Sequence, residues 1–341
     1  MSVCDAMKRV TSIDVARRAG VSQSTVSRVF SLGSAVAEDK RRRVLDAARE
    51  LGYQPNAIAR SLTTRRTNII GIVMANLTSP FYPYVLEKFL QHFRAMDRQT
   101  LLFTAAPDQD IDDIVPHIMQ HRVDALIVTS ALLSTEMADE CLRYGLPVIL
   151  FNRYILNSNA NAVCTDNVEG GRQIANLLLD TGHQRIAYIA GQPQTSTNAD
   201  REKGFSDRLR ERGMTTWLRE QGDFSYQSGY EAAARLLARR DRPDAIFAAS
   251  DNMALGTMDA ARYELGLRVP EDVSVVGFDG IPMSGWPPYR LTTVAQQVDL
   301  MVEETIRLML EKIEDISSKP VMTLVPGRLI VRSSVRGCMG T

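Results

Sequence analysis

The sequence predicts two units of different class, a small all-α head and a larger α/β core of two doubly wound lobes. Three observations support this division. The chain has 341 residues, which is more than one compact core usually contains. Residues 1–66 hold 13 Lys and Arg against 6 Asp and Glu, whereas the remainder holds 27 against 34. Short apolar runs that alternate with helical stretches follow from residue 68 onward.

The head begins with two short helices separated by a glycine. Thr11 and Asp14 have the spacing of a capping box, and Gly20 can take the left-handed conformation that ends a helix. Ser22 can then cap a second helix, predicted from Gln23 to Phe30. Two short helices joined by a tight turn form a helix-turn-helix, whose second helix enters the major groove of DNA.

The outer face of the second predicted helix suits contact with DNA. Gln23 and Arg28 belong to the residue types that pair in bidentate fashion with adenine and guanine edges, and hydroxyls hold phosphates. A third helix is predicted from Glu38 to Leu51, with Lys40-Arg41-Arg42-Arg43 outside. The apolar side chains expected inside it are Val44, Leu45, Ala48 and Leu51. A solvated basic tail and an unrelated three-helix domain are the alternatives that this pattern leaves open.

The core repeats one pattern twice. Strands are predicted at NIIGIVMA, TLLFTAA, DALIVTS and PVILF, and after Asp166 at RIAYIAG, DAIFAAS and VSVVGFDG. The helices expected after Asp166 span about 168–181, 200–212, 226–240 and 252–265. Strand–helix repetition gives parallel sheets covered on both faces. Ligands bind at the carboxyl ends of such strands, here where the two lobes would face each other.

Both units resemble one known family. The run SIDVARRAGVSQSTVSRVF, followed by VLDAARELGYQPNAIARSL, closely resembles the DNA-binding module of the lactose/galactose repressor (LacI/GalR) family. The segments NLTSPFY, DNVEGGRQIANLL, GHQRIAYIAG, SDNMALG, VSVVGFDG and LTTV resemble the core of the same family. That core shares its fold with periplasmic sugar-binding proteins. The resemblance covers essentially the whole chain and implies a helix-turn-helix head on a periplasmic-binding-protein-like core.

The resemblance implies three parts in chain order. They are a helix-turn-helix domain, a hinge helix with its linker, and an effector-binding and dimerisation core, expected at 1–54, 55–66 and 67–341. Helix 298–314 belongs to the first lobe in such proteins. The first lobe is therefore expected at about 67–165 and 296–325, and the second at about 166–295 and 326–341.

The resemblance also implies which residues contact DNA. Gln23, Ser24 and Arg28 are expected to read bases. The residues expected to hold the DNA backbone are Ser22, Thr25, Ser27, Tyr53 and Asn56. In the hinge helix, Ala59 is expected at the DNA, and Leu62 matches a leucine that enters the minor groove as a kinking wedge. A linker leucine packed on the core is the alternative for Leu62. Ala37 departs from the usual Ser or Thr, so the third helix lacks a side-chain cap.

An effector site in the cleft between the lobes is the second implication. The residues expected to line it are Phe81, Tyr82, Asn152, Arg153, Asp166, Arg201, Phe224, Ser250 and Asp279. Aromatic faces together with charged side chains suit a small polyol. The three aromatic residues could instead be plain core, and Arg153 could instead be an exposed loop residue. Asp251 is expected to cap a helix that begins at Asn252 rather than to touch the ligand.

The charge of the effector stays open at this stage. Arg153 and Arg201 could form a neutral network with Asp166 and Asp279, in which case the ligand is an uncharged sugar. One guanidinium could instead remain free for the carboxylate of a sugar acid. Nucleosides are a third possibility.

Other classes of protein find little support in the sequence. GxGxxG, P-loop, GxSxG and HExxH patterns are absent, and the four cysteines and four histidines are scattered, so we expect no enzyme, no cofactor and no metal. No apolar run is long enough for a secretory signal or a membrane span, which predicts a cytoplasmic protein.

The sequence thus predicts an effector-responsive transcriptional regulator. It is expected to repress genes of sugar or sugar-acid uptake or catabolism, and to bind a pseudo-palindromic DNA operator as a homodimer. The alternative is a solute-binding protein or a sugar-handling enzyme on the same fold. The effector, its sense as inducer or co-repressor, the operator sequence and any oligomer above the dimer stay open.

Overall fold

The computed structural model describes residues 10–30, 36–54, 66–75, 77–104, 111–129, 133–156 and 158–337. The chain divides into two compact units, Met1–Thr67 and Asn68–Thr341. Within the described ranges, no helix is both long and apolar enough to cross a membrane. The predicted DNA contacts Asn56, Ala59 and Leu62 lie outside the described residues.

The described residues of the first unit form three helices, α1 (Ser12–Ala19), α2 (Gln23–Val29) and α3 (Glu38–Leu51). The capping box is present, because the Thr11 side chain accepts from the Asp14 backbone N–H while the Asp14 carboxylate accepts from that of Thr11. Gly20 then ends α1 at φ 64°, where a Cβ would be strained. The three helices enclose a small core made of Val15, Ala16, Ala19, Val26, Val29, Val44, Ala47 and Ala48.

One core prediction for α3 is wrong. Leu45 is 37% exposed, and Ala47 is buried in its place. The buried positions Val44, Ala47 and Ala48 follow the three- and four-residue spacing of one helix face, whereas Leu45 is turned about 100° away from Val44. Ala37 forms no side-chain cap, as expected, yet α3 begins directly after it with two acidic residues that favour the positive end of the helix dipole.

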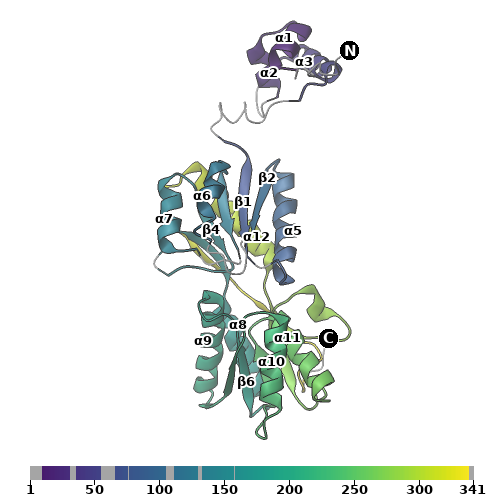
Figure 1. Cartoon of the computed structure of the whole chain (residues 1–341), viewed down its shortest axis with the longest axis vertical. Helices are drawn as coiled ribbons and strands as arrows, with labels where there is room; N and C mark the ends of the chain where they lie inside the picture. The colour runs from purple at the N-terminus through teal and green to yellow at the C-terminus, as the bar shows by residue number, and fades with distance from the viewer. Residues whose placement is uncertain are drawn as a thin grey trace, which may run out of the picture. The chain divides into compact units, whose positions relative to one another are not determined.

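The described residues of the second unit form two six-stranded sheets. The first sheet has the order β11-β5-β4-β3-β1-β2, and its neighbouring strands are parallel. Its strands are β1 (Ile69–Met74), β2 (Gln99–Thr104), β3 (Ala125–Val128), β4 (Val148–Phe151), β5 (Asn161–Thr165) and β11 (Met322–Val325). The helices α5 (Phe81–Ala95) and α12 (Val298–Glu314) pack on one face, and α6 (Val115–Gln120) and α7 (Thr135–Arg143) on the other (Figure 1). This sheet with its helices is the first lobe.

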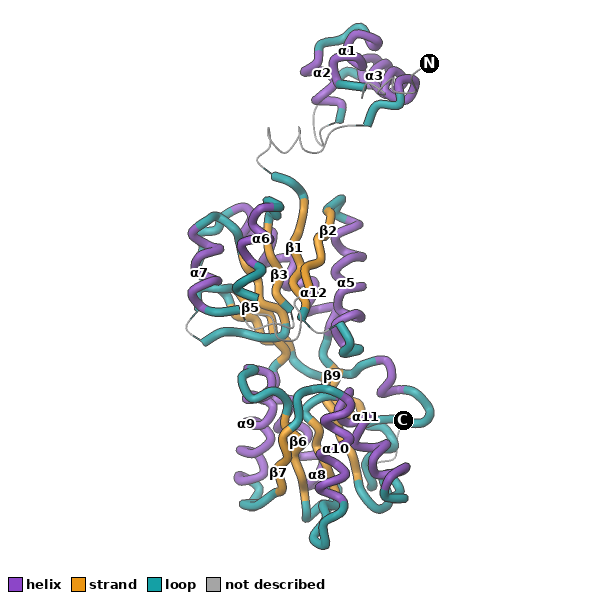
Figure 2. The backbone as a smooth tube through the Cα atoms, viewed as in Figure 1, coloured by secondary structure: helices purple, strands orange, loops and turns teal. Residues whose placement is uncertain are grey.

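The second sheet has the order β12-β10-β9-β8-β6-β7, and only the edge strand β12 among those described runs antiparallel. Its strands are β6 (Ile186–Ala190), β7 (Leu218–Gln221), β8 (Ala245–Ala248), β9 (Ser274–Asp279), β10 (Thr292–Ala295) and β12 (Arg328–Ile330). The helices α8 (Asn167–Asp180) and α9 (Ser196–Glu211) cover one face, and α10 (Tyr226–Leu237) and α11 (Asp251–Asp259) the other (Figure 2). This sheet with its helices is the second lobe.

The chain passes between the lobes after β5, after β10 and after β11. Two doubly wound sheets in one core, together with a separate unit whose described residues are helical, confirm the predicted fold class. The helix predicted at about 200–212 begins earlier, at Ser196, because the Thr195 side chain accepts from the Asn198 backbone N–H and caps it.

Close packing of α8 against α9 fixes the helix that carries Arg201. A Cβ built at Gly204 would lie 1.9 Å from the carbonyl oxygen of Val168, and one at Gly171 would lie 2.4 Å from that of Arg201. Both contacts are with backbone atoms, which cannot swing away as the end of a side chain can. The two helices therefore approach as closely as they do only because these positions lack a side chain.

We predict that Gly204→Ala will lower the free energy of unfolding by about 3 kcal/mol, because α9 must move away from α8. Urea denaturation of the full chain measures the change. Gly285→Ala is the matched control, since a Cβ there meets nothing closer than 3.7 Å. Equal stability of the two variants would contradict the packing argument.

Candidate functional site

The outer face of α2 is open in the first unit. Gln23, Ser24, Ser27 and Arg28 are exposed, while Val26 and Val29 are buried beneath them. Gln23 Nε2 donates to Ser12 Oγ at 3.1 Å, so α1 orients the amide. The described residues give the Arg28 guanidinium no hydrogen bond or ion pair. A free guanidinium and an oriented amide on one exposed helix face fit the expected contact with base edges.

The predicted phosphate contacts also have local roles. Ser22 caps α2, because its Oγ accepts from the Thr25 backbone N–H at 3.3 Å. Ser22 Oγ also lies 2.9 Å from Thr25 Oγ1. Tyr53 is half-buried, with its ring centroid 5.8 Å from that of Phe30. These residues thus hold the helix-turn-helix together whether or not DNA is bound, and their expected phosphate contacts stay a prediction.

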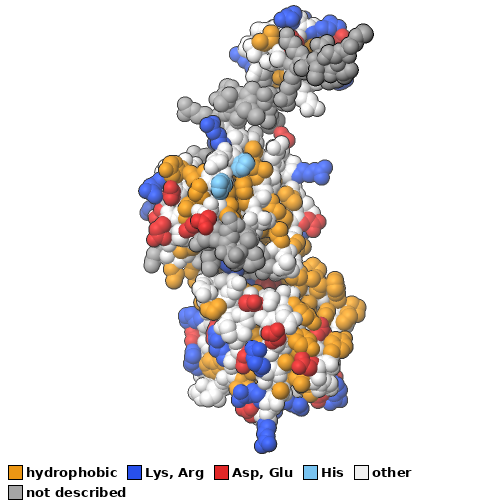
Figure 3. Space-filling view, viewed as in Figure 1, with side chains coloured by type: hydrophobic (Ala, Val, Ile, Leu, Met, Phe, Trp, Pro, Cys, Tyr) orange, Lys and Arg blue, Asp and Glu red, His pale blue; other side chains and the backbone are white. Residues whose placement is uncertain are grey.

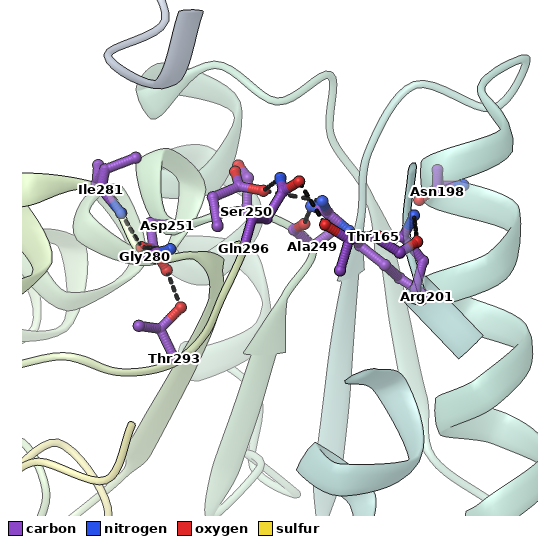
Figure 4. A network of polar contacts seen from close by, with 12 residues as sticks. Thr165, Asn198, Arg201, Ala249, Ser250, Asp251, Gly280, Ile281, Thr293 and Gln296 are labelled. Atoms are coloured by element: carbon purple, nitrogen blue, oxygen red, sulfur yellow. Dashed lines mark hydrogen bonds and ion pairs between the residues drawn. The ribbon is translucent and has the colours of Figure 1, made fainter. Parts of the chain in front are cut away.

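Arg201 is the most enclosed charged side chain of the predicted effector site. It is 2% exposed and comes from the first turns of α9. Its Nε donates to Asn167 Oδ1 at 2.9 Å, its Nη1 to the Ala249 carbonyl at 2.5 Å, and its Nη2 to Asp279 Oδ1 at 2.8 Å (Figure 4). The guanidinium also lies 3.8 Å from the centre of the Phe278 ring. Each nitrogen of the guanidinium therefore has a partner.

Asp279 links this arginine to the segment that returns to the first lobe. Its Oδ1 accepts from Gln296 Nε2 at 2.8 Å as well as from Arg201. Gln296 Oε1 in turn accepts from Thr165 Oγ1 at 2.7 Å, at the end of β5. Burial raises the pKa of Asp279, and the Arg201 charge and the Gln296 amide oppose that rise. Asp279 Oδ2 accepts no hydrogen bond from the described residues, so it can take one from a ligand hydroxyl.

Three of the predicted site residues have strained backbone. Asn152, Phe224 and Asp279 have φ of 63°, 73° and 119°, although none is glycine. Such conformations cost about 1–3 kcal/mol each and persist where the surroundings impose them, often at ligand sites. Asn152 and Asp279 lie at the carboxyl ends of β4 and β9, and Phe224 follows β7. The strain thus falls at the edges where ligands bind in doubly wound sheets.

The predicted residues of the first lobe are buried, and none of the hydrogen bonds among the described residues joins them to the Arg201 network. Phe81 and Tyr82 belong to the hydrophobic core, with their rings edge to face and 5.3 Å between centroids. Asn152 and Arg153 are 4% and 9% exposed. The Oδ1 atom of Asn152 and the Nε atom of Arg153 are buried and have no hydrogen-bond partner among the described residues.

Two predicted ligand contacts are helix caps. Asp166 accepts from the Glu169 backbone N–H at 2.9 Å and begins α8. Ser250 accepts from the Met253 backbone N–H at 3.3 Å and begins α11. Phe224 packs its ring over Gly191, where a Cβ would lie 2.1 Å from the ring. All three lie at the carboxyl edge of a sheet, and their expected contacts with a ligand stay a prediction.

The expectation that Asp251 caps its own helix is wrong. Ser250 takes that position, and Asp251 is fully buried in the first turn. Its carboxylate accepts from the backbone N–H groups of Gly280 and Ile281 at 2.8 and 2.9 Å, and from Thr293 Oγ1 at 2.6 Å (Figure 4). Asp251 therefore fixes the loop that follows Asp279.

A direct contact between the lobes forms beside Arg153. The Tyr154 backbone N–H donates to Ser196 Oγ at 3.1 Å, and the Tyr154 hydroxyl donates to Asp200 Oδ1 at 3.1 Å. Tyr154 follows β4 of the first lobe, whereas Ser196 and Asp200 belong to α9 of the second. Asp200 immediately precedes Arg201, so one turn of α9 contacts both the first lobe and the buried arginine network.

Sequence reasoning missed the residues that position Arg201 and Asp279. Asn167 and Gln296 each come directly after a predicted site residue or at the end of a strand, which was the available signal. Tyr154, Thr165 and Asp251 also stand next to predicted site residues, but this position does not reveal their roles, because the roles depend on partners far away in the sequence.

A helix-turn-helix unit in the same chain as a two-lobed α/β core, with a polar network at the edges of both sheets, defines a class of protein. It is the class of DNA-binding regulators that respond to a small molecule. Comparison of the sequence with known protein families agrees with this class. The family model described as bacterial regulatory proteins, lacI family, matches residues 12–56, and the periplasmic binding protein-like domain matches residues 175–335.

Similarity to individual proteins extends over nearly the whole chain. The HTH-type transcriptional repressor PurR of Mannheimia succiniciproducens is 32% identical over 330 residues, which cover 95% of this chain and 98% of the relative. The solved structure of a transcriptional regulator CelR–cellobiose complex is 33% identical, with a TM-score of 0.71, covering 96% of this chain and 100% of that one. The lac repressor dimer bound to operator and the anti-inducer ONPF is 28% identical, with a TM-score of 0.85, covering 96% and 99%.

The chain belongs to the lacI family of bacterial regulatory proteins. It is therefore a DNA-binding transcriptional regulator, and the alternatives of a solute-binding protein and a sugar-handling enzyme are set aside.

Asp251 should make the stability of the core depend on pH. Burial, and next the charge of Asp279, raise the pKa of Asp251 to about 7, whereas the hydrogen bonds from Thr293, Ile281 and Gly280 oppose that rise. A carboxyl group whose pKa is higher in the folded state favours folding at low pH, and this contribution is lost as the pH rises from about 4 to about 7.

We predict that Asp251→Asn will remove this part of the pH dependence, at most about 4 kcal/mol between pH 4 and 7. Chemical denaturation of both proteins across that range measures the difference. The exposed Glu231→Gln change is the control for the loss of one carboxyl group. Parallel pH curves for wild type and Asp251→Asn would contradict the assignment.

Proposed function

We propose that this protein is a repressor, active in the cytoplasm, of genes for the uptake or catabolism of a sugar or a sugar acid. It binds a pseudo-palindromic operator as a homodimer, and a metabolite in the cleft of the core alters that binding. The single observation that carries this proposal is the hydrogen-bonded path from Arg201 through Asp279 and Gln296 to Thr165. This path joins the candidate effector site to two of the segments by which the chain passes between its lobes.

The path gives a physical route from ligand to lobe orientation. Gln296 follows β10 and Thr165 ends β5, so both lie where the chain changes lobe. A ligand hydroxyl that donates to Asp279 competes for the charge that holds Arg201 and Gln296. A ligand can shift the lobes only by its difference in affinity for their two arrangements. The Tyr154 contacts with Ser196 and Asp200 belong to the arrangement seen here.

The distribution of charge supports DNA binding by the head alone. Figure 3 shows acidic and basic side chains intermixed over the face of the core that is drawn. The excess of Lys and Arg falls in residues 1–66, on the unit with the exposed α2. Affinity for the phosphate backbone, and its dependence on salt, should therefore come from this unit. The hinge contacts Asn56, Ala59 and Leu62 are part of the proposal on the strength of the resemblance.

We predict that Gln23→Ala will relax base preference at one or two operator positions, at a cost of about 1–3 kcal/mol there. The reason is that the Gln23 amide is exposed and oriented by Ser12. Selection of duplexes from a random library by the wild-type chain supplies the operator, and binding to its single-base variants gives the specificity profile. Arg28→Ala should relax preference at a different position.

A uniform loss of affinity over all variants would show instead that the altered residue holds a phosphate. Arg49→Ala is the control for loss of one exposed positive charge on the same unit, because Arg49 lies in the last turn of α3 and not on α2.

We predict that Arg201→Ala will abolish the effector response while operator binding persists. The variant leaves the Asp279 carboxylate buried without its ion-pair partner, which should destabilise the core by about 3–5 kcal/mol. The double change Arg201→Ala with Asp279→Ala restores much of that stability without restoring ligand binding, so loss of fold and loss of site can be separated. Titration of the core with sugars, sugar acids and nucleosides, followed by operator binding with each ligand found, gives the measurement. A wild-type response in either variant would remove the proposed site.

A further inference from the structure

Arg153 is a buried guanidinium without a counter-charge. It is 9% exposed, and its Nε is buried with no hydrogen-bond partner among the described residues. None of the hydrogen bonds and ion pairs within the described ranges involves Arg153. Leaving a cation of this kind in a protein interior is costly unless a partner arrives.

The position of Arg153 places it at the boundary between the lobes. It is the second residue after β4, at the carboxyl edge of the first sheet. The next residue, Tyr154, bonds through its backbone and its hydroxyl to α9 of the second lobe. Ligands of doubly wound sheets bind at this kind of edge. Arg153 therefore lies where the proposed effector site would be and not in the interior of one lobe.

Acidic side chains at this boundary between the lobes bond to other groups. Asp200 accepts from the Tyr154 hydroxyl, and Asp166 accepts from the Glu169 backbone N–H. Neither forms an ion pair with Arg153 within 4.0 Å. Asp279 pairs with Arg201, which is fully engaged on all three nitrogens. Of the two arginines proposed for the effector site, one thus belongs to a neutral pair and the other keeps its charge.

The neighbouring side chain, Asn152, lacks a hydrogen-bond donor. The Asn152 Oδ1 atom is buried and accepts no hydrogen bond from the described residues, and its backbone is held at φ 63°. An amide oxygen in that state needs a donor, whereas the guanidinium needs an acceptor, and a charged acceptor gives the stronger bond. A polyol that carries an acidic group supplies both.

We propose that Arg153 binds the anionic group of the effector, so that the effector is a sugar derivative with a carboxylate or a phosphate group. Asn152 accepts a hydrogen bond from a hydroxyl of the same ligand. The Arg201–Asp279 pair, already neutral, recognises further hydroxyls. This inference rests on the proposed function, because it names the class of ligand for the same site.

The first experiment needs no knowledge of the effector. Thermal unfolding of the full chain is followed in sodium chloride, sodium acetate and sodium phosphate at one ionic strength. Arg153→Met keeps an unbranched apolar stem and removes the charged group, and the exposed Arg240→Met is the matched control. We expect acetate or phosphate to raise the midpoint of the wild type and of Arg240→Met by about 2 °C or more relative to chloride, and to leave Arg153→Met unchanged.

The same thermal unfolding curves also test whether Arg153 lacks a partner within the protein. In chloride, Arg153→Met should unfold at the same temperature as the wild type or at a higher one, because it removes an unpaired buried charge. Equal responses of all three proteins to acetate and phosphate would overturn the proposal. So would a midpoint of Arg153→Met in chloride well below that of Arg240→Met, since Arg153 would then have a structural partner.

The second experiment separates the two sources of negative charge. Titration calorimetry compares D-glucose with D-glucuronate, D-galactose with D-galacturonate, and D-glucose with D-glucose 6-phosphate. We expect the wild type to bind an acid at least tenfold more tightly than its neutral parent, and Arg153→Met to lose that preference. A preference for uronates assigns a carboxylate, and a preference for the phosphate ester assigns a phosphate. A neutral sugar that both proteins bind equally well and more tightly than its acid would refute the inference.

Operator binding by the same samples keeps this inference distinct from the proposed function. If Arg153→Met and the wild type both bind the selected operator and both release it with a neutral sugar, the proposed function is supported and only the proposed class of effector is wrong. If neither protein binds any selected duplex, the proposed function itself fails.

Discussion

The core depends on one buried ion pair. Arg201 is 2% exposed. Burial of its guanidinium is tolerated only because Asp279, Asn167 and the Ala249 carbonyl accept hydrogen bonds from it. These partners come from β9, from the start of α8 and from the end of β8. The position of α9 that delivers Arg201 depends in turn on the glycines at the α8–α9 contact. The carboxyl edge of the second sheet is thus assembled around this charge.

From that pair, hydrogen bonds lead out of the second lobe. Gln296 bridges Asp279 and Thr165, and Asp251 fixes the loop after Asp279. On the same helix as Arg201, Asp200 bonds to Tyr154 of the first lobe. A ligand that engages the pair therefore acts on groups that also set how the lobes meet. This arrangement gives a small molecule a mechanical route to the lobes without any covalent chemistry.

The two units differ in net charge, and this difference matches the ligands proposed for them. The excess of basic residues belongs to the head, whose exposed helix face suits DNA, whereas the core has an acidic balance that disfavours a polyanion. Within the core, the lone charge of Arg153 contrasts with the neutral pair of Arg201 and Asp279. We thus propose that a nucleic acid and a small acidic ligand are recognised by positive charge at two separate sites.

The sequence by itself determined the elements and the fold class, because these follow from short-range rules. The capping box at Thr11 and Asp14, the left-handed turn at Gly20 and the alternation of apolar strands with helices are all local, and the structure has them. The resemblance to the LacI/GalR family supplied candidates such as Asp279, whose place at a strand end agrees with ligand binding at the carboxyl edge of parallel strands.

Only the tertiary structure decided how the candidates pair. It assigned Ser250 and not Asp251 as the cap of α11, exposed Leu45, brought in Asn167 and Gln296, and left Arg153 without a partner. The sequence left the choice between a neutral network and a free guanidinium open. Whether a charge is paired depends on atoms that lie dozens of residues apart in the chain, as Arg201 and Asp279 do. Such distances are set by the packing of helices and sheets and not by the pattern of any one segment.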